Sequence, residues 1–178
     1  MTIESIVTEI CTEVNDPEEI TYHDRALALY KSSVMELIDN NKFTEPELAR
    51  LIENTEITIT EGETSYDMDD TGHEVYRLLG LWRHPDELSS NITFTQIPYQ
   101  QMGTITINDD LKPFSDEVLW STGGDKIWTH ANVDDNVEGN LRYIRPPLDN
   151  DYQYLNNIFN KKAIALAVQK LRIEIAGE

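Results

Sequence analysis

Cysteine and long apolar runs are what this sequence has least of. Its 178 residues include one cysteine, Cys11, so the chain cannot form an internal disulfide or a thiolate metal cluster. Cys11 falls on a helical pattern, which favours a small core residue over a nucleophile. No apolar run approaches the roughly 18 residues that a membrane helix needs. The N-terminus, MTIESIVTEI, carries acids where a secretory leader carries bases, so we expect neither a leader nor a membrane anchor.

Basic residues are also scarce. Fourteen Lys and Arg stand against 33 Asp and Glu, a formal net charge of −19. This balance argues against a surface that grips nucleic acid, because such a surface sets Lys and Arg against phosphates. Three interpretations stay open: a wall along which DNA slides without being held, a DNA mimic, and a simply well-solvated surface. About a quarter of the residues are Ile, Leu, Val or Phe, above the roughly 20% below which a charged chain fails to fold.

Three helices are predicted in the first 54 residues. Residues 3–14 repeat apolar side chains at helical spacing and keep glutamates on the other side. A second helix is predicted from Thr21, with Asp24 completing a capping box, to about Asp39. A third, shorter helix is predicted from Thr44, with a capping glutamate three residues on and a proline in its first turn. We therefore expect a helical N-terminal segment over residues 1–54.

The hydrophobic period then changes from 3.6 to 2, which predicts a β region over residues 55–148. Residues 75–82 are apolar on both faces and predict a central strand. Residues 84–117 receive no firm assignment, although 93–97 and 104–107 are compatible with short strands. The N-terminal helices are therefore expected to lead into an antiparallel sheet.

A long β-hairpin arm is predicted over residues 124–147. Residues 126–131 form its first strand and 140–145 its return, each with alternating faces. The polar link 132–139 is too long for a two-residue turn and is expected to project as a loop or tip. Two prolines end the return strand, because neither can donate to a sheet ladder. A final helix is predicted over about 152–176.

No motif in the sequence predicts catalysis. The four histidines share no metal-ligand spacing, and no HExxH, CxxC, GxSxG or phosphate-binding glycine motif occurs. Asp134 and Asp135 invite a cation site, but they lack the alternating ligand spacing of an EF-hand loop, so a solvated tip is the alternative. We expect no enzyme, no cofactor and no metal.

Charged residues near the end of the chain are candidates for protein contacts. The final helix holds the one basic cluster: Lys161, Lys162, Lys170 and Arg172. Part of this cluster compensates the helix dipole, and the rest could meet an acidic partner. On the return strand, two arginines flank Tyr143 and could pair with carboxylates across a subunit contact, or equally with a neighbouring strand.

Several short motifs follow one another along the chain. They are Asn15-Asp16-Pro17, Thr21-Tyr22-His23-Asp24, the strand entry with Gly62, Tyr66 and Met68, the apolar strand ending at Trp82, the Gly-Asp-Lys-Ile strand at 124–127, the return with Gly139, Leu141, Tyr143, Pro146 and Pro147, and an alanine-rich last helix. In this order they resemble the head-to-tail adaptor, or connector, proteins of tailed bacteriophages. The resemblance covers nearly the whole chain and depends on the order of its motifs more than on any one of them.

The resemblance implies a fold and a role. The expected fold is α+β, mainly a helical bundle with an inserted antiparallel β region and a long β-hairpin arm, in a single adaptor domain over residues 1–178. The expected role is a ring subunit, usually one of twelve, that joins the portal protein to the tail or the next neck ring. DNA would pass through the bore without being bound specifically. Such a protein is made in the host cytoplasm and ends in the virion at the head–tail junction, away from membranes.

The resemblance also suggests which residues make contacts. Residues 161–178 would dock on the portal, with the four basic residues named above as candidates. The β-arm would meet the neighbouring subunit or the next tail ring. Its candidate residues are Asn132, Asp134, Asp135, Asn136, Arg142 and Arg145.

Other functions remain compatible with the sequence. One is a different phage neck or tail-completion protein of the same composition. Another is an acidic DNA mimic that inhibits a nuclease or a regulator, and a third is a hydrolase without a recognisable motif. A ring with a bore, a stable dimer that blocks a DNA-binding enzyme, and substrate turnover would respectively identify the adaptor, the mimic and the enzyme.

Overall fold

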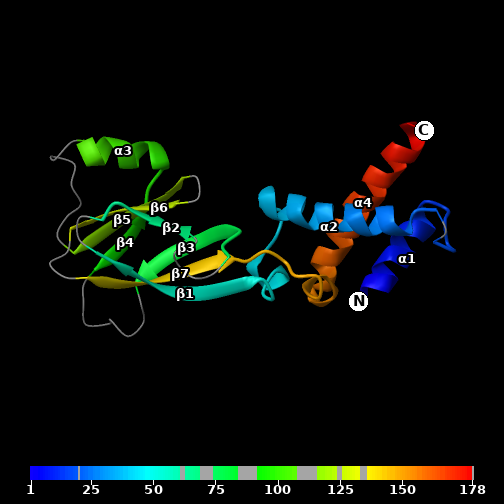
Figure 1. Cartoon of the computed structure of the whole chain (residues 1–178), viewed down its shortest axis with the longest axis horizontal. Coiled ribbons are helices and arrows are strands. Elements are labelled where there is room, and N and C mark those ends of the chain that lie inside the picture. Colours follow the sequence, from blue (N-terminus) through cyan, green and yellow to red (C-terminus); the bar gives the residue numbers. More distant parts are fainter. Residues whose placement is uncertain are drawn as a thin grey trace. The chain divides into compact units, whose positions relative to one another are not determined.

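The fold is seen in a computed structural model of the chain, which describes residues 1–19, 21–60, 63–68, 74–83, 92–107, 116–123, 126–132 and 136–177 (Figure 1). Within these ranges the chain forms four α-helices and seven β-strands. Its contacts divide it into two compact units. We call Met1–Leu51 with Pro147–Glu178 the helical unit, and Ile52–Pro146 the β unit.

The helical unit joins the two ends of the chain. Helix α4 (Asn157–Gly177) packs against both α1 (Ile3–Glu13) and α2 (His23–Asp39). Two 3-10 turns, η1 (Glu45–Glu47) and η5 (Asp151–Tyr154), lie beside the points where the chain leaves and re-enters the unit. The alanines of α4 allow close packing of its buried face, which consists of Phe159, Asn160, Ala163, Ile164, Ala167, Val168 and Leu171.

A hydrogen-bonded polar pair lies within this core. The hydroxyl of Tyr30 on α2 donates to Asn160 Oδ1 at 2.7 Å, and Asn160 Nδ2 donates to the Leu155 carbonyl at 3.2 Å. Burial raises the pKa of the Tyr30 phenol, and Asn160 is fully buried. Because a buried polar group without a partner costs free energy, these bonds fix how α2 meets the start of α4.

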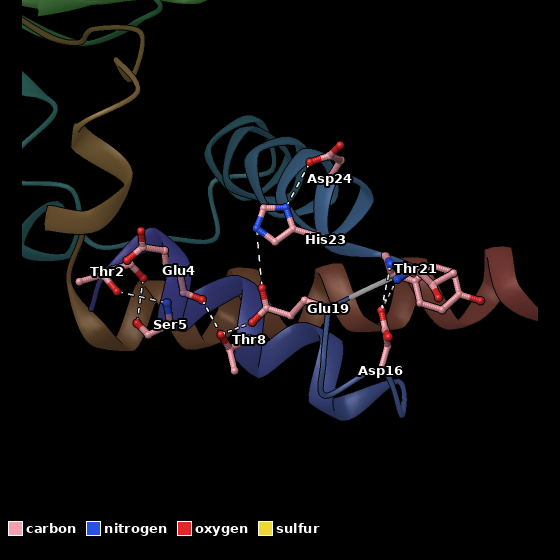
Figure 2. Close-up of polar contacts among 10 residues, drawn as sticks. Thr2, Glu4, Ser5, Thr8, Asp16, Glu19, Thr21, His23 and Asp24 are labelled. Atoms are coloured by element: carbon pink, nitrogen blue, oxygen red, sulfur yellow. Dashed lines mark hydrogen bonds and ion pairs between the residues drawn. The ribbon is translucent and has the colours of Figure 1, made fainter.

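The turn before α2 is capped by a side chain from outside the helix. Asp16 Oδ2 accepts from the N–H groups of Thr21 and Tyr22 at 3.0 and 2.9 Å, as Figure 2 shows. The predicted capping box of Thr21 and Asp24 is therefore wrong, since α2 begins at His23 and its N-cap has no side-chain cap. Asp16, in the preceding loop, binds the backbone N–H groups at the start of the helix instead. Residue spacing within the helix does not reveal this contact.

The same loop holds α1 beside α2. Glu19, with a φ of 56°, turns its carboxylate toward both helices (Figure 2). It accepts a hydrogen bond from the Thr8 hydroxyl of α1 and lies 3.7 Å from His23 Nε2 at the start of α2. These contacts fix the position of α1, which forms one wall of the groove described below.

The third predicted helix is only one turn long. Its capping glutamate is confirmed, because Glu47 accepts from the Thr44 N–H at 2.8 Å. The turn ends at once, because Leu48 and Leu51 are fully buried in the helical unit and the chain continues as a strand from Ile52.

The described strands of the β unit form two sheets. Sheet A has the order β1 (Ile52–Ile59), β7 (Val137–Ile144), β3 (Arg77–Arg83), and both pairings are antiparallel. The chain enters the unit on β1 and leaves it from β7, with Ile52 opposite Ile144. The β unit is therefore an insertion whose first and last strands are neighbours.

Sheet B faces sheet A across a shared core. Its order is β2 (Ser65–Asp67), β6 (Lys126–Asn132), β5 (Glu117–Gly123), β4 (Thr93–Gln96). Among these described strands the β4–β5 pair is parallel and the other two pairs are antiparallel. Helix α3 (Tyr99–Ile107) links those two strands and packs on sheet B. The core between the sheets contains Ile57, Ile59, Leu81, Val118, Trp120, Ile127, Ala131, Val137, Leu141 and Tyr143.

The predicted fold class is wrong in two respects. The described chain is α+β, but it is not mainly a helical bundle, because a seven-stranded β unit forms its middle. The long hairpin arm does not exist either: β6 pairs with β5 and β2, and β7 pairs with β1 and β3. Both strands were recognised by their alternation, but both apolar faces point into the same core, which places them in facing sheets.

Other strand predictions have mixed outcomes. Residues 75–82 correspond to β3, which lies at an edge of sheet A with a bulge between Leu78 and Gly80, so β7 and not β3 is central. Residues 93–97 do form a strand, β4, whereas 104–107 belong to helix α3. The single adaptor domain stays a prediction. The chain passes from one unit to the other between residues 51 and 52 and between residues 146 and 147. None of the described helices is long and apolar enough to cross a bilayer.

Candidate protein-docking groove on the helical unit

The basic residues of α4 make different contacts from one another. Lys162 Nζ lies 2.8 Å from Glu47 Oε1 and 3.0 Å from Oε2. The Glu47 side chain is 8% exposed. The hydrogen bond from Lys162 lowers the pKa of the Glu47 carboxyl against the opposing effect of burial, and the Thr44 N–H adds to the lowering. Lys162 therefore stabilises the attachment of η1 to α4.

Lys170 and Arg172 also bind within the helical unit. Lys170 Nζ lies 2.8 Å from Glu36 Oε2 on α2. Arg172 Nη2 donates to the Glu13 carbonyl at 2.7 Å and to Glu13 Oε2 at 3.1 Å, at the end of α1. Lys161 is exposed and has no hydrogen-bond or ion-pair partner within the described ranges. Of the four predicted docking residues, Lys161 is thus the one whose charge is not used inside the unit.

A groove of about 310 Å³ runs between α1 and α4. Two of the predicted docking residues, Lys161 and Arg172, lie on its wall, about 16 Å apart along the helix at 1.5 Å per residue. The complete lining is Glu9, Glu13, Lys161, Ile164, Ala165, Val168 and Arg172.

The groove has an apolar floor between two charged rims. Ile164 and Val168 are buried, and exposed Ala165 leaves space above them. α1 supplies an acidic rim and α4 a basic rim, which the Glu13–Arg172 ion pair joins at one end. The other two charged residues of the rims, Glu9 and Lys161, have no hydrogen-bond or ion-pair partner in the described part of the chain. Such a groove suits the apolar stripe of a helix or an extended segment, with charges on the rims to set its direction.

The two predicted contact arginines, Arg142 and Arg145, both lie within the β unit. Arg145 Nε donates to Glu53 Oε1 at 2.8 Å, and the Tyr143 hydroxyl donates to Glu53 Oε2 at 3.2 Å. Arg145 also donates to the Pro146 carbonyl at 3.1 Å. This is the cross-strand pairing left open by the sequence. Arg142 lies on the outer face of sheet A, opposite Asn54 on one side and Gly80 on the other.

The predicted tip residues are only partly described. Asp134 and Asp135 lie outside the described residues. Asn132 ends β6, opposite Glu117 of β5, and exposed Asn136 directly precedes β7. Within the described ranges, no group of three or more His, Cys, Asp and Glu residues is placed to hold a metal. The described arm candidates belong to the β unit, whereas the basic residues of α4 belong to the helical unit.

Sequence reasoning missed the half of the groove that α1 supplies. Residues 161, 165, 168 and 172 recur at helical spacing and form one row of α4, a signal the sequence does contain. Glu9 and Glu13 lie at the other end of the sequence, however, and their helical pattern does not reveal which helix they face. The groove depends on a tertiary contact and could not be read from either helix alone.

The comparisons with known proteins leave the family open. The motif order described above is therefore the basis of the resemblance to phage adaptors. No protein-family model matches the chain, and no curated protein matches it either.

Proposed function

We propose that this chain is a virion structural protein, a subunit of the ring that joins a phage portal to the tail and lets DNA pass. The observation that carries the proposal is the α1–α4 groove. Its α4 wall belongs to the segment that the resemblance assigns to portal docking, and its form suits a protein segment. The order of sequence motifs supports the same role.

The groove indicates what the docking segment should look like. Its apolar floor would receive small or branched apolar side chains at helical spacing. Opposite charges stand on the two rims, so the segment would place a basic side chain near Glu9 and an acidic one near Lys161. The proposed partner segment is therefore amphipathic and carries both charges.

The overall charge supports passage of DNA rather than its capture. A net charge of −19 on each subunit would give the bore of a ring a potential that repels phosphate. Repulsion between such subunits also favours assembly on a template, such as the portal, over assembly in free solution.

The direct test of the groove is a pair of substitutions that spare the internal ion pairs. Lys161→Glu with Ala165→Glu reverses the charge at one end of the basic rim and places a larger, charged side chain over the floor, and both residues are exposed. The matched control is Gln169→Glu, an exposed position on the same helix outside the groove. Co-sedimentation with the cognate portal should fall at least about tenfold for the double variant and stay unchanged for the control, with wild-type circular dichroism in both. Undiminished co-sedimentation of the double variant would reject the groove as the docking site.

A further inference from the structure

The outer face of sheet A carries a row of side chains across all three of its strands. Asn140 of β7 stands opposite Glu56 of β1 on one side and opposite Trp82 of β3 on the other. Their chain neighbours Ile57, Leu81 and Leu141 point into the core, so this row points outward. With strands about 4.8 Å apart, the row spans about 10 Å.

Trp82 forms a flat aromatic surface at one end of the row. A Cβ placed on Gly80 would lie 2.8 Å from Cζ3 of the Trp82 ring, so the indole lies against the strand where glycine leaves room for it. The residue is nevertheless 38% exposed. An indole held in place by its own strand, with part of its surface in solvent, offers a preformed face to a ligand.

A polar hollow of about 360 Å³ lies at the other end of the row. It is lined by Asn54, Thr55, Glu56 and Asn140. Asn140 Oδ1 is shielded from solvent and has no hydrogen-bond partner among the described residues. Asn54 likewise has no side-chain partner in those ranges. Amide side chains provide both hydrogen-bond donors and acceptors, so the hollow can bind hydroxyl groups that donate and hydroxyl groups that accept.

We propose that this face of the β unit binds a neutral oligosaccharide. One sugar ring would lay its C–H face on the Trp82 indole, whose π surface is electron-rich. The next sugar would place its hydroxyls in the hollow, where the Asn54 amide can donate and accept and Asn140 Nδ2 can donate. The site lies in the β unit, so it is independent of the docking groove.

The composition of the face favours a sugar over other ligands. A protein contact of this size would present an apolar centre, whereas here one indole stands among amides and charged groups. An anionic glycan or nucleic acid would meet Glu56 as well as Arg142 on this face, and a chain of net charge −19. Uncharged hydroxyls on an aromatic platform need neither an apolar patch nor a basic one.

Saturation-transfer NMR on the full chain tests the proposal. The probes are cellohexaose, maltohexaose, mannohexaose and chitohexaose, each at about 5 mM, a level that detects even millimolar binding. At least one should receive saturation from the wild-type protein. Trp82→Ala should abolish the signal, and Gly80→Ala should weaken it because the added methyl displaces the indole. Tyr99→Ala is the matched control, since Tyr99 is 47% exposed in the same unit and should leave binding unchanged.

Three results would overturn the proposal. The first is no transfer to any of the four probes from a wild-type sample whose circular dichroism shows it folded. The second is sugar binding by the Trp82→Ala and Gly80→Ala variants that equals binding by the wild-type protein. The third is sedimentation showing self-association that Trp82→Ala abolishes without any sugar binding, which would make this face a contact between copies of the chain. Should Trp82→Ala fail to fold, Gly80→Ala and Asn140→Ala decide the outcome, and unchanged binding in both counts against the site.

Discussion

Lys161 and Lys162 are adjacent in sequence and play different roles at the residue scale. Lys162 binds the buried carboxylate of Glu47, whereas Lys161 has no partner among the described residues. Lys162→Met should lower the free energy of unfolding by about 1–3 kcal/mol, because it removes a charged hydrogen bond and leaves Glu47 without its counter-ion. Lys161→Met should change it by less than about 0.5 kcal/mol. Urea unfolding of the two variants measures the difference, and equal stabilities would contradict this assignment.

The same pair makes a prediction about pH. Lys162 lowers the pKa of Glu47 in the folded chain below its value in the unfolded chain. The unfolded state therefore binds the proton more readily, and this contribution to stability is present above the unfolded pKa, about 4.3. It is lost as the pH falls through that value toward the lower folded pKa. The stability difference between wild type and Lys162→Met should thus shrink between about pH 5 and pH 3. A difference that stays constant over this range would show that Glu47 and Lys162 are not coupled.

Single residues also show where the sequence was informative. The buried Cys11 and the capping role of Glu47 were both predicted, because each depends on a pattern within a few residues. The Asp16 cap was not predicted, and cross-strand pairing of Arg145 was left open without naming Glu53, because these partners come from outside the local pattern. Local chemistry is readable where donor and acceptor belong to one element.

At the scale of elements, the separation of β6 and β7 into facing sheets is open to test. Face-to-face sheets lie about 10 Å apart, and Asn132 and Val137 end and begin strands in different sheets. Deleting residues 133–135 leaves two Cα steps, at most about 7.6 Å, between these two residues. The strand ends must then unpair, and the melting temperature should fall by at least about 5 °C, equivalent to roughly 2 kcal/mol.

The control for that deletion keeps the length of the link. Replacing residues 133–135 by Gly-Ser-Gly should leave the melting temperature within about 2 °C of wild type, since the span is preserved. A projecting hairpin tip, as the sequence predicts, would tolerate the deletion equally well. Calorimetry of both variants therefore decides between the hairpin and the two-sheet arrangement, and an unchanged melting temperature after deletion would contradict the latter.

Most strands and long helices could be predicted from the sequence, but the strands and helices that they pack against could not. Alternation identified β6 and β7, and helical spacing identified α1, α2 and α4. A period of two shows that one face of a strand is buried without showing which strand lies beside it. α3 was missed because its sequence, YQQMGTITI, mixes β-branched residues and a glycine with few helix formers, and its packing on sheet B overrides that propensity.

At the scale of the whole molecule, an inserted β unit separates the helical segments at the two ends of the chain. The proposed adaptor role places protein docking in the helical unit, and the charge of −19 would make subunits repel one another. Raising the salt concentration from 50 to 500 mM shortens the Debye length from roughly 14 to 4 Å. Rings should therefore form more readily at 500 mM than at 50 mM salt. Analytical ultracentrifugation with the portal at both salt concentrations measures this, and assembly that weakens steadily with salt would indicate that opposite charges dominate the contact.

The most direct measurement of the central claim is electron microscopy of the purified chain mixed with its cognate portal. We expect rings with an open bore seated on the portal, lost in the Lys161→Glu, Ala165→Glu variant and retained in Gln169→Glu. A chain that stays monomeric or dimeric beside free portals, whatever the salt concentration, would contradict the assignment of this protein to the head–tail junction.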